Sequence, residues 1–396
     1  MNEMIYFDNA ATTYPKPEQV YQAMDDVNRH MAVNAGRGSY ALAQSASALI
    51  EETRKLILEI VKADDAAEVV LTASATLACN QILGGISWEN VHVVYVSPYE
   101  HNAVMRALYH QKEGYGFRIE ELAMDIKNLT LDISRIKYQF STCPPDVVIM
   151  THVSNVTGYI LPVQEVLEAA EKYHPITIID ASQAFCLVPI ELRSMPVDYY
   201  VFAGHKTPYG PFGIGGFVNN HARRLNTYLA GGTGSDSLNL KMPESGSSRY
   251  EPGSPNIVAI AGLKAALEML GEKKSCPVDR NERIREILQR EQHMTEYLTE
   301  QLSKISGVRL YLPYESREHV GIVAFNVAGL QAEDVAMILD EDYHIAVRAG
   351  YHCAPLIHKY VPNVDSAGVV RASLGRFTTI DEIDSLVRAV EEIAEG

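Results

Sequence analysis

The segment DYYVFAGHKTPYGPFGIGGFV, residues 198–218, carries most of the information about the fold. It begins and ends with short apolar runs, Asp198–Phe202 and Gly215–Val218, which we predict to be strands. Runs with little polar alternation are typical of strands that other elements cover on both faces. Between them, Lys206 follows Gly204 and precedes a glycine-rich stretch in which the backbone can approach a bound group closely. The segment therefore predicts a buried sheet with a lysine just beyond the end of one strand.

Similar apolar runs recur on the N-terminal side of this segment, separated by stretches of helical periodicity. We predict four more strands, at Glu68–Leu71, Val91–Val96, Asp146–Met150 and Ile176–Ile179. The alternation of short apolar runs with helices indicates an α/β fold with a mainly parallel sheet.

The pattern changes after Asn256, where a second, smaller domain is predicted to begin. The segment Gly231–Gly253 before it is rich in Gly, Ser and Pro and is predicted to be a long loop. A capping box of Thr379 and Glu382 predicts the last helix. The other predicted elements are helices at Ile257–Leu270 and Asn281–Ile305 and strands at Val308–Leu312 and Gly321–Val327.

The composition is that of an ordinary globular protein with an acidic balance. The 396 residues include 34 Lys and Arg against 50 Asp and Glu, a formal charge of −16 that argues against a nucleic-acid surface. Apolar residues make up 47% of the chain without forming a run that could span a bilayer, so we expect a soluble, cytoplasmic protein with no membrane partner. The five cysteines lack CxxC spacing, which favours reduced thiols over a metal site.

Polar residues follow five of the predicted strands. In an open parallel sheet, ligands bind at the carboxyl ends of the strands, so these residues are candidates for one shared site. Polar loops close strands in most proteins, but five groups at one sheet edge indicate a binding crevice. They are Thr72–Thr76, Glu100–Asn102, His152 with Ser154 and Asn155, Asp180 with Ser182 and Gln183, and Gly204–Lys206.

These side chains match the requirements of pyridoxal 5'-phosphate (PLP): an amine, an acid for the pyridine nitrogen, a phosphate seat and a flat contact. Lys206 supplies the amine. Asp180 lies at the end of an apolar strand, where burying an unpaired carboxylate costs free energy. An ion pair with a protonated ring nitrogen would offset that cost. Ser74 to Thr76 precede a predicted helix, Leu77–Leu83, whose N-terminus suits a phosphate, and His101 could stack on the ring.

Each of these residues also has an ordinary structural explanation. Lys206 could lie on a surface loop, Asp180 could cap a helix, His101 could be a surface histidine, and Thr76 could be an N-cap. Their order along successive strands is phosphate seat, stacking ring, aspartate and lysine. This joint placement favours the cofactor site.

The chain resembles a known family over nearly its whole length. The motifs that carry the resemblance are YFDNAATT at 6–13, EHN at 100–102, HVSN at 152–155, DASQ at 180–183, GHK at 204–206, EPGSPN at 251–256, RAGYHCA at 348–354 and VRAS at 370–373. They are similar to those of fold-type I PLP enzymes of aminotransferase class V, and the RAGYHCA segment resembles group II cysteine desulfurases in particular. Ala203 and Tyr40 depart from the residues common in that group.

The resemblance implies the PLP-dependent transferase fold of type I. The large domain, residues 14–256, would contain a mainly parallel seven-stranded sheet. Residues 1–13 and 257–396 would form the smaller α+β domain, which carries the cysteine loop. The resemblance also implies a homodimer.

The resemblance implies a role for each matched residue. Lys206 would hold PLP, Asp180 its ring nitrogen, Gln183 its phenolic oxygen and His101 its face, with Lys206, His101 and Cys353 as the catalytic residues. The phosphate would lie against Ala75, Thr76 and His205, joined by Ser254 of a second subunit, with Asn155 also near the cofactor. Arg371, Asn155 and Arg348 would bind the substrate carboxylate, and Cys353 would take sulfur from L-cysteine as a persulfide and pass it to an acceptor protein.

Several alternatives stay open at this stage. A selenocysteine lyase would use the same scaffold on L-selenocysteine, and the sequence does not separate the two. Another class V aminotransferase or Cβ lyase is disfavoured by Cys353. A non-catalytic scaffold of the same fold is disfavoured because Lys206, Asp180, His101 and Arg371 are all present.

Overall fold

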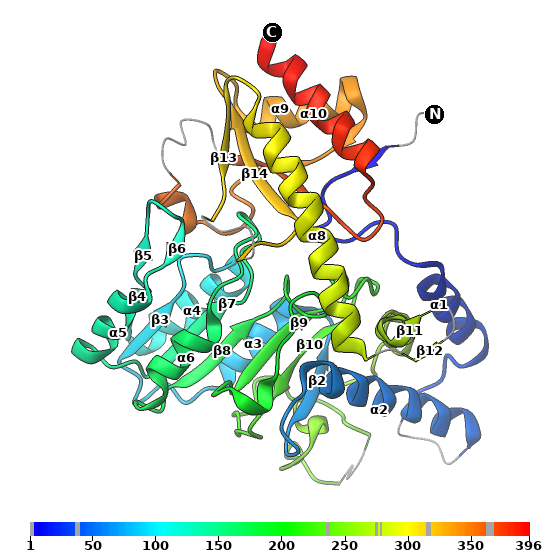
Figure 1. Ribbon diagram of the computed structural model, residues 1–396. Helices are drawn as coiled ribbons and strands as arrows, with labels where there is room; N and C mark the ends of the chain where they lie inside the picture. Colours follow the sequence, from blue (N-terminus) through cyan, green and yellow to red (C-terminus); the bar gives the residue numbers. More distant parts are fainter. Residues whose placement is uncertain are drawn as a thin grey trace.

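A seven-stranded sheet forms the centre of the larger part of the molecule (Figure 1). The computed structural model describes residues 4–35, 40–234, 238–273, 276–277, 279–313, 318–361 and 368–396. In spatial order the strands are β2 (Glu68–Thr72), β10 (Gly215–Asn219), β9 (Tyr199–Ala203), β8 (Ile176–Asp180), β7 (Val147–Thr151), β3 (Val93–Val96) and β4 (Arg118–Glu121). The expected fold class is confirmed, and the six predicted strands lie at or near their predicted positions.

Two features of this sheet were not predicted. The edge strand β4 has the polar sequence RIEE, so it lacks the apolar run used to find the other strands. Strand β10 runs antiparallel to both β9 and β2, while the remaining neighbours are parallel. The short connection 204–214 explains this direction, because a parallel return needs a longer crossover, usually a helix. This connection carries Lys206.

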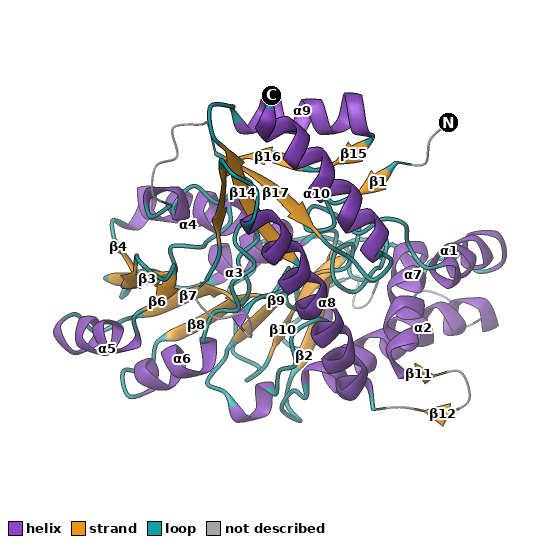
Figure 2. Cartoon of the chain, turned by 45° about the horizontal axis from the view of Figure 1, so that its top comes forward, coloured by secondary structure: helices purple, strands orange, loops and turns teal. Residues whose placement is uncertain are grey.

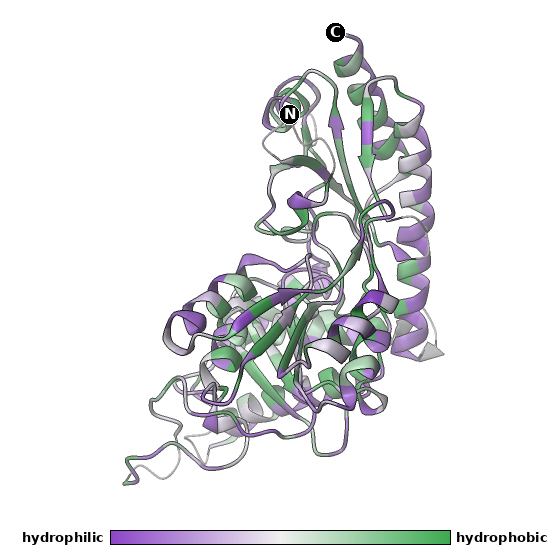
Figure 3. Ribbon diagram, turned by 90° about the vertical axis from the view of Figure 1, so that its left-hand side faces the viewer, coloured by the Kyte–Doolittle hydropathy of each residue, from purple (hydrophilic) through white to green (hydrophobic). Residues whose placement is uncertain are grey.

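Helices cover both faces of the sheet, which is why its central strands are continuously apolar (Figure 3). Alternate side chains of β9 belong to opposite cores: Tyr199 and Val201 pack with the side of α3 and α4, whereas Tyr200 and Phe202 pack with the other layer. The helices are α1 (Glu18–His30), α2 (Ala41–Val61), α3 (Ala75–Gly85), α4 (Asn102–Tyr115), α5 (Ile133–Thr142), α6 (Val163–Glu171), α7 (Ile257–Glu268), α8 (Arg280–Ser303), α9 (Ala332–Tyr343) and α10 (Ile380–Glu395).

A smaller antiparallel sheet of four strands lies beyond the large one, packed with α8, α9 and α10 (Figure 2). Its order is β13 (Val308–Tyr311), β14 (Ile322–Val327), β17 (Val369–Ser373) and β16 (Arg348–Gly350). The predicted capping box of Thr379 and Glu382 is confirmed at the start of α10. Phe7 joins the apolar core of this region, because β1 (Ile5–Tyr6) pairs with β15 (Ile345–Ala346).

The remaining paired strands are short: β5 (Met124–Asp125) with β6 (Thr130–Leu131), and β11 (Glu272–Lys273) with β12 (Cys276–Pro277). The predicted loop Gly231–Gly253 contains a 3-10 helix at Ser247–Arg249, and residues 235–237 lie outside the described residues. The predicted domain boundary after residue 256 stays a prediction; α7, which follows it, packs against α1 and α2. Among the described residues, every helix is too short or too polar to span a bilayer.

Candidate active site

A cavity of about 210 Å³ opens at the carboxyl ends of β7, β8 and β9, next to the smaller sheet. The structure brings ten of the predicted site residues to its wall. These are Ala75, Thr76, His101, Asn155, Asp180, Gln183, His205, Lys206, Arg348 and Arg371. Ser254 and Cys353 do not line it.

Lys206 reaches the cavity from the turn that follows β9. Gly204 is required there, because a Cβ at this position would lie 2.8 Å from the Ile214 carbonyl oxygen. Burial lowers the pKa of Lys206 to about 8; Asp180 acts in the opposite direction, and Arg371 acts with burial. An amine with this pKa is still mostly protonated at pH 7, but a far larger fraction is neutral than for an exposed lysine, and the neutral amine is the form that can act as a nucleophile or base.

Asp180 ends β8 and is buried. Its Oδ1 accepts hydrogen bonds from the Ser182 backbone N–H at 2.9 Å and the Ser182 hydroxyl at 2.6 Å. These bonds fix the carboxylate in a turn, so Asp180 is not a helix cap. Behind it, burial raises the pKa of Glu100 to about 8, and Asp180 adds to this shift. The Glu100 side chain is therefore expected to stay protonated at neutral pH.

The start of α3 forms the candidate phosphate seat. The helix begins at Ala75, two residues before its predicted start, and Ser74 is its N-cap, with its hydroxyl accepting from the Leu77 N–H at 3.2 Å. The exposed Thr76 lies in the first turn, where backbone N–H groups lack intrahelical partners. Strand β10 passes close to the first residue of α3 at Gly215. Only glycine fits there, because a Cβ would lie 2.9 Å from the Ala75 nitrogen.

Three further side chains complete this half of the cavity. The His101 ring caps α4, its Nδ1 accepting from the Ala103 N–H at 3.0 Å; burial and the nearby Lys206 lower its pKa to about 4, so the ring is neutral. Gln183 Nε2 donates to the Ala10 carbonyl at 2.7 Å. Burial lowers the pKa of His205 to about 4, and its Nδ1 is buried without a hydrogen-bond partner among the described residues.

This set of groups fits PLP. It offers an amine of lowered pKa, a fixed buried carboxylate, a neutral ring for a stacking contact, and hydroxyl and N–H donors at a helix N-terminus. The unpartnered Nδ1 of His205 is a polar atom that a ligand would satisfy. The described residues contain no group of three or more His, Cys, Asp or Glu placed to hold a metal ion.

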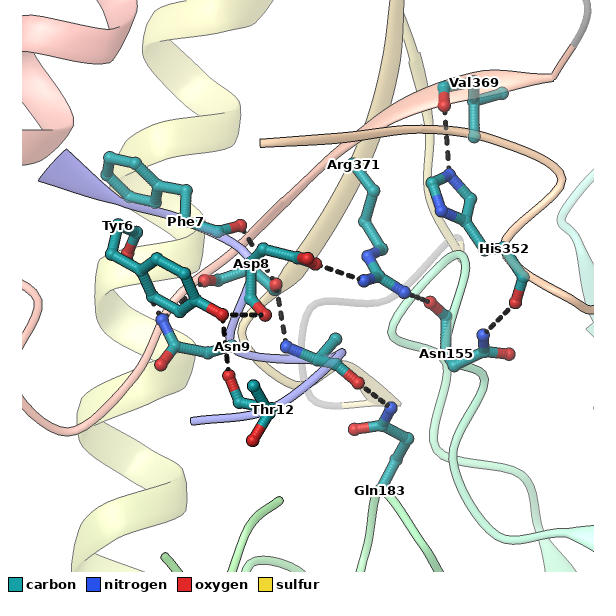
Figure 4. A network of polar contacts seen from close by, with 12 residues as sticks. Tyr6, Phe7, Asp8, Asn9, Thr12, Asn155, Gln183, His352, Val369 and Arg371 are labelled. Carbon is teal, nitrogen blue, oxygen red and sulfur yellow. Dashed lines mark hydrogen bonds and ion pairs between the residues drawn. The ribbon is translucent and has the colours of Figure 1, made fainter. Parts of the chain in front are cut away.

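Arg371 forms the opposite wall, on β17 of the smaller sheet (Figure 4). Its side chain is 1% exposed, and its pKa is lowered by burial. One terminal nitrogen, Nη2, donates to Asp8 Oδ1 at 2.6 Å, and the other, Nη1, donates to the Asn155 carbonyl at 2.9 Å. Arg348 on β16 is opposite Arg371 in the strand register and also lines the cavity. Two guanidinium groups at one wall are suited to an amino-acid carboxylate.

Asn155 was expected to bind the substrate carboxylate, but in this structure its polar groups contact the protein. Its Nδ2 donates to the His352 carbonyl at 2.7 Å, and its own carbonyl accepts from Arg371 (Figure 4). In this structure Asn155 therefore ties the cysteine loop to the arginine. A direct contact between its amide and a substrate carboxylate stays a prediction.

Cys353 lies outside the cavity on an exposed loop next to it. His352 and Cys353 are consecutive residues in the left-handed backbone conformation, with φ of 48° and 57°. Residues other than glycine rarely adopt this conformation. Three contacts impose it: Asn155 holds the His352 carbonyl, the Asn102 N–H donates to the Cys353 carbonyl at 2.6 Å, and His352 Nε2 lies 3.0 Å from the Val369 carbonyl oxygen. Backbone strain of this kind is typical of functional positions.

The other described cysteines are in different surroundings. Cys79 and Cys186 are buried, and burial raises the pKa of both thiols. Cys143 is partly buried, and the side chain of Cys276 lies outside the described part of the chain. Among the four described cysteines, Cys353 is the exposed one.

Ser254 is exposed and lies away from the cavity of its own chain, where its hydroxyl accepts from Asn34 Nδ2 at 3.3 Å. It lines a separate hollow with Arg54 and Glu251, which form an ion pair at 2.5 Å. The location is compatible with the expected contact to a second subunit, which stays a prediction.

Two participants in this site were not identified from the sequence. Asp8 lies inside the motif YFDNAATT, but a carboxylate in an N-terminal segment gives no sign that it meets Arg371 across 363 residues. Ser182 was predicted to lie at the crevice, but it was given no role. It follows Asp180 by two residues, and this spacing could have identified it as a hydrogen-bond partner of the carboxylate.

Comparison with known proteins identifies the family of the chain. The family model for aminotransferase class V matches residues 5–386. The chain belongs to this family.

Relatives that match nearly the whole chain are named cysteine desulfurase or probable cysteine desulfurase. A cysteine desulfurase of Escherichia coli O157:H7 is 31% identical over 403 residues, covering 98% of this chain and 93% of the relative. A probable cysteine desulfurase of Halalkalibacterium halodurans is 30% identical and covers 99% of this chain and 93% of its own length. The apo structure of cysteine desulfurase from Thermococcus onnurineus superimposes with a TM-score of 0.89 at 30% identity, covering 100% of this chain and 96% of that one. Family and fold, as expected from the sequence, are confirmed.

Proposed function

We propose that this chain is a PLP-dependent cysteine desulfurase that converts L-cysteine to L-alanine and takes the sulfur on Cys353 as a persulfide. The observation that carries the proposal is one cavity with Lys206 and Asp180 on one side and two arginines on the other, beside an exposed cysteine loop. Full-length relatives named cysteine desulfurase support it.

The groups of the large sheet would hold PLP, which supplies an electron sink for charge developing at the substrate Cα. The amine of Lys206 would hold the cofactor and, when free, would take the Cα proton of the substrate, for which a pKa near 8 is suited. The carboxylate of Asp180 would stabilise a proton on the pyridine nitrogen of the cofactor. The neutral His101 ring supplies a flat contact without placing a second cation over the ring.

The groups of the smaller sheet would bind and orient the substrate. Arg371 and Arg348 hold the α-carboxylate, so that the thiol of the substrate is directed toward the cysteine loop. Cys353, as thiolate, attacks the substrate sulfur: an S–S bond forms, the Cβ–S bond breaks, and its electron pair is protonated at carbon. L-cysteine and the Cys353 thiol thus give L-alanine and a Cys353 persulfide, without an added oxidant or reductant.

Three accompanying features belong to the same proposal. The protein works as a homodimer in which Ser254 approaches the phosphate of the partner's site, consistent with its exposed position. Cys353, being exposed, delivers sulfur to an acceptor protein. The reaction takes place in the cytoplasm, in keeping with reduced thiols and the absence of a membrane-spanning helix among the described residues.

The direct test measures alanine and sulfide from L-cysteine, with L-selenocysteine in parallel, on protein loaded with PLP. We expect one alanine per sulfur released, with a reductant present. A protein that stays colourless with added PLP would contradict the proposal and favour a scaffold. Alanine from selenocysteine but none from cysteine would identify a selenocysteine lyase.

A further inference from the structure

Arg371 is a buried cation whose orientation is set by two acceptors that belong to the protein. Its Nη2 donates to Asp8 Oδ1 at 2.6 Å, and its Nη1 donates to the Asn155 carbonyl at 2.9 Å (Figure 4). A planar guanidinium held at both terminal nitrogens cannot turn in its plane. Its Nε is buried without a hydrogen-bond partner among the described residues, so N–H capacity remains for a ligand.

Asp8 is itself held in place by the backbone on either side of it. The Tyr6 hydroxyl donates to the Asp8 carbonyl at 3.1 Å, and Asp8 forms an isolated parallel bridge with Ser373, two residues after Arg371 on β17. The Ser373 N–H donates to the Phe7 carbonyl at 2.6 Å. The N-terminal segment thus lies along β17 in a fixed register that sets the carboxylate of Asp8 beside the guanidinium.

The charges of Asp8 and Arg371 indicate that the pair has a role besides stabilising the fold. A buried guanidinium without a counter-ion is costly, and Arg348, also on this wall, repels it. Asp8 supplies the counter-charge, yet its side chain is 22% exposed while that of Arg371 is 1% exposed. Arg371 lines the cavity and Asp8 does not, so the carboxylate holds the guanidinium without occupying the space that a ligand would enter.

We infer that Asp8 is a positioning residue for substrate recognition: it holds Arg371, with the Asn155 carbonyl, in the orientation that binds the α-carboxylate of an amino-acid substrate. The inference rests on the proposed function, in which Arg371 is the carboxylate clamp. It excludes two simpler roles for Asp8. If Asp8 competed with the substrate for Arg371, its removal would strengthen substrate binding. If Asp8 were needed only for folding, its removal would weaken the binding of all ligands alike.

The test compares two ligands that differ only in the carboxylate, L-alanine and ethylamine, on PLP-loaded protein. Their dissociation constants are read from the absorbance change of the cofactor. In Asp8→Ala we expect the dissociation constant of L-alanine to rise about tenfold or more, with that of ethylamine changed less than about twofold. Asp8→Asn keeps an oxygen acceptor without the charge and should lie between the parent and Asp8→Ala.

Two variants calibrate the measurement. Arg371→Lys removes the bidentate fork and should show the same selectivity for L-alanine as Asp8→Ala or a stronger one. Asp65→Ala removes an exposed carboxylate that does not line the cavity, and should bind both ligands as the parent does.

The outcomes separate the alternatives. Tighter binding of L-alanine to Asp8→Ala would show competition and overturn the inference, as would equal loss of affinity for both ligands. A second readout does not need the cofactor: modification of Arg371 by phenylglyoxal, mapped by mass spectrometry, should be at least about fivefold faster in Asp8→Ala, because the guanidinium loses one of its two fixed contacts. An unchanged rate would contradict the inference. Failure of the parent protein to bind PLP would instead contradict the proposed function.

Discussion

The cavity around Lys206 and the loop that carries Cys353 are neighbours in space but are built in opposite ways. Lys206 and the groups near it follow strand ends of the large sheet, and burial sets their charge states: the pKa of Lys206 falls to about 8, and that of His101 to about 4. Cys353 is exposed, on a loop held in a left-handed conformation by contacts to Asn102 and Asn155. The difference indicates that cofactor chemistry and sulfur transfer are assigned to separate parts of the molecule.

This separation has a physical reason. A lysine can act as a base near neutral pH only where burial disfavours its charged form. A persulfide that must reach another protein cannot be enclosed in the same way. The two regions meet at Asn155, whose carbonyl accepts from Arg371 and whose side chain holds the His352 carbonyl (Figure 4).

The largest effect is expected from removing the amine of the cavity. Lys206→Ala should lower alanine production from L-cysteine by about 10³-fold or more, because attachment of the cofactor and transfer of the Cα proton are both lost. Alanine release in a steady-state assay measures the loss.

Lys16 is a natural control for this assignment, since burial lowers its pKa to about 8 as well and its Nζ donates to the His205 carbonyl at 2.7 Å. Borohydride reduction of the parent protein followed by peptide mapping should place the cofactor on Lys206. An adduct on Lys16 would show that the wrong amine has been identified.

A smaller effect, confined to the second half of the comparison, is expected from the loop. Cys353→Ser should retain PLP and bind L-cysteine, yet yield no persulfide and about 10²-fold less alanine, because a hydroxyl is a poor acceptor for sulfur. Mass spectrometry of the protein and the alanine assay together measure both consequences. Cleavage of L-selenocysteine should fall less, since selenium leaves more readily.

Cys143→Ser is the matched control for the loop, because Cys143 is a partly buried thiol remote from the cavity wall. It should behave as the parent does. If Cys353→Ser releases alanine from L-cysteine at the parental rate, the two regions are not divided as proposed, and a lyase that expels sulfur without a protein thiol becomes the better account.

The last prediction concerns the stability of the protein and not its activity, and it rests on the carboxyl group of Glu100 near Asp180. The pKa of Glu100 is about 8 in the folded protein against an ordinary value of 4.5. Between these values the unfolded chain is ionised and the folded one is protonated, so the contribution of Glu100 to the free energy of unfolding falls by about 1.4 kcal/mol per pH unit as pH rises. It is fully present below pH 4.5 and lost by about pH 8.

Glu100→Gln removes this titration. The free energy of unfolding of the variant, relative to the parent, should therefore increase from pH 5 to pH 8 in urea denaturation. Glu89→Gln, at an exposed position, should show no such trend. A parallel pH dependence for Glu100→Gln and the parent would mean that Glu100 is ionised beside Asp180, and the charge pattern of the cavity would need revision.

The sequence by itself determined the sheet, its helices and most of the cavity wall. Apolar runs located six of its strands because strands covered on both faces leave a continuous signal, and ligand-binding residues follow such strands directly in the chain. The edge strand β4 was missed, since only one of its sides pairs with a neighbour and three of its four residues are charged. The helices α1 and α2 were also not predicted.

Only the tertiary structure decided what depends on contacts between distant segments. Asp8 and Arg371 meet across 363 residues, and Asn155 meets His352 across 197. No pattern in the neighbouring sequence indicates either pair. Each contact forms only when two distant segments of the chain pack together in the folded protein. The charge states of Lys206, His101 and Glu100 follow for the same reason, since burial is a property of the folded chain and a residue's neighbours in sequence do not fix it.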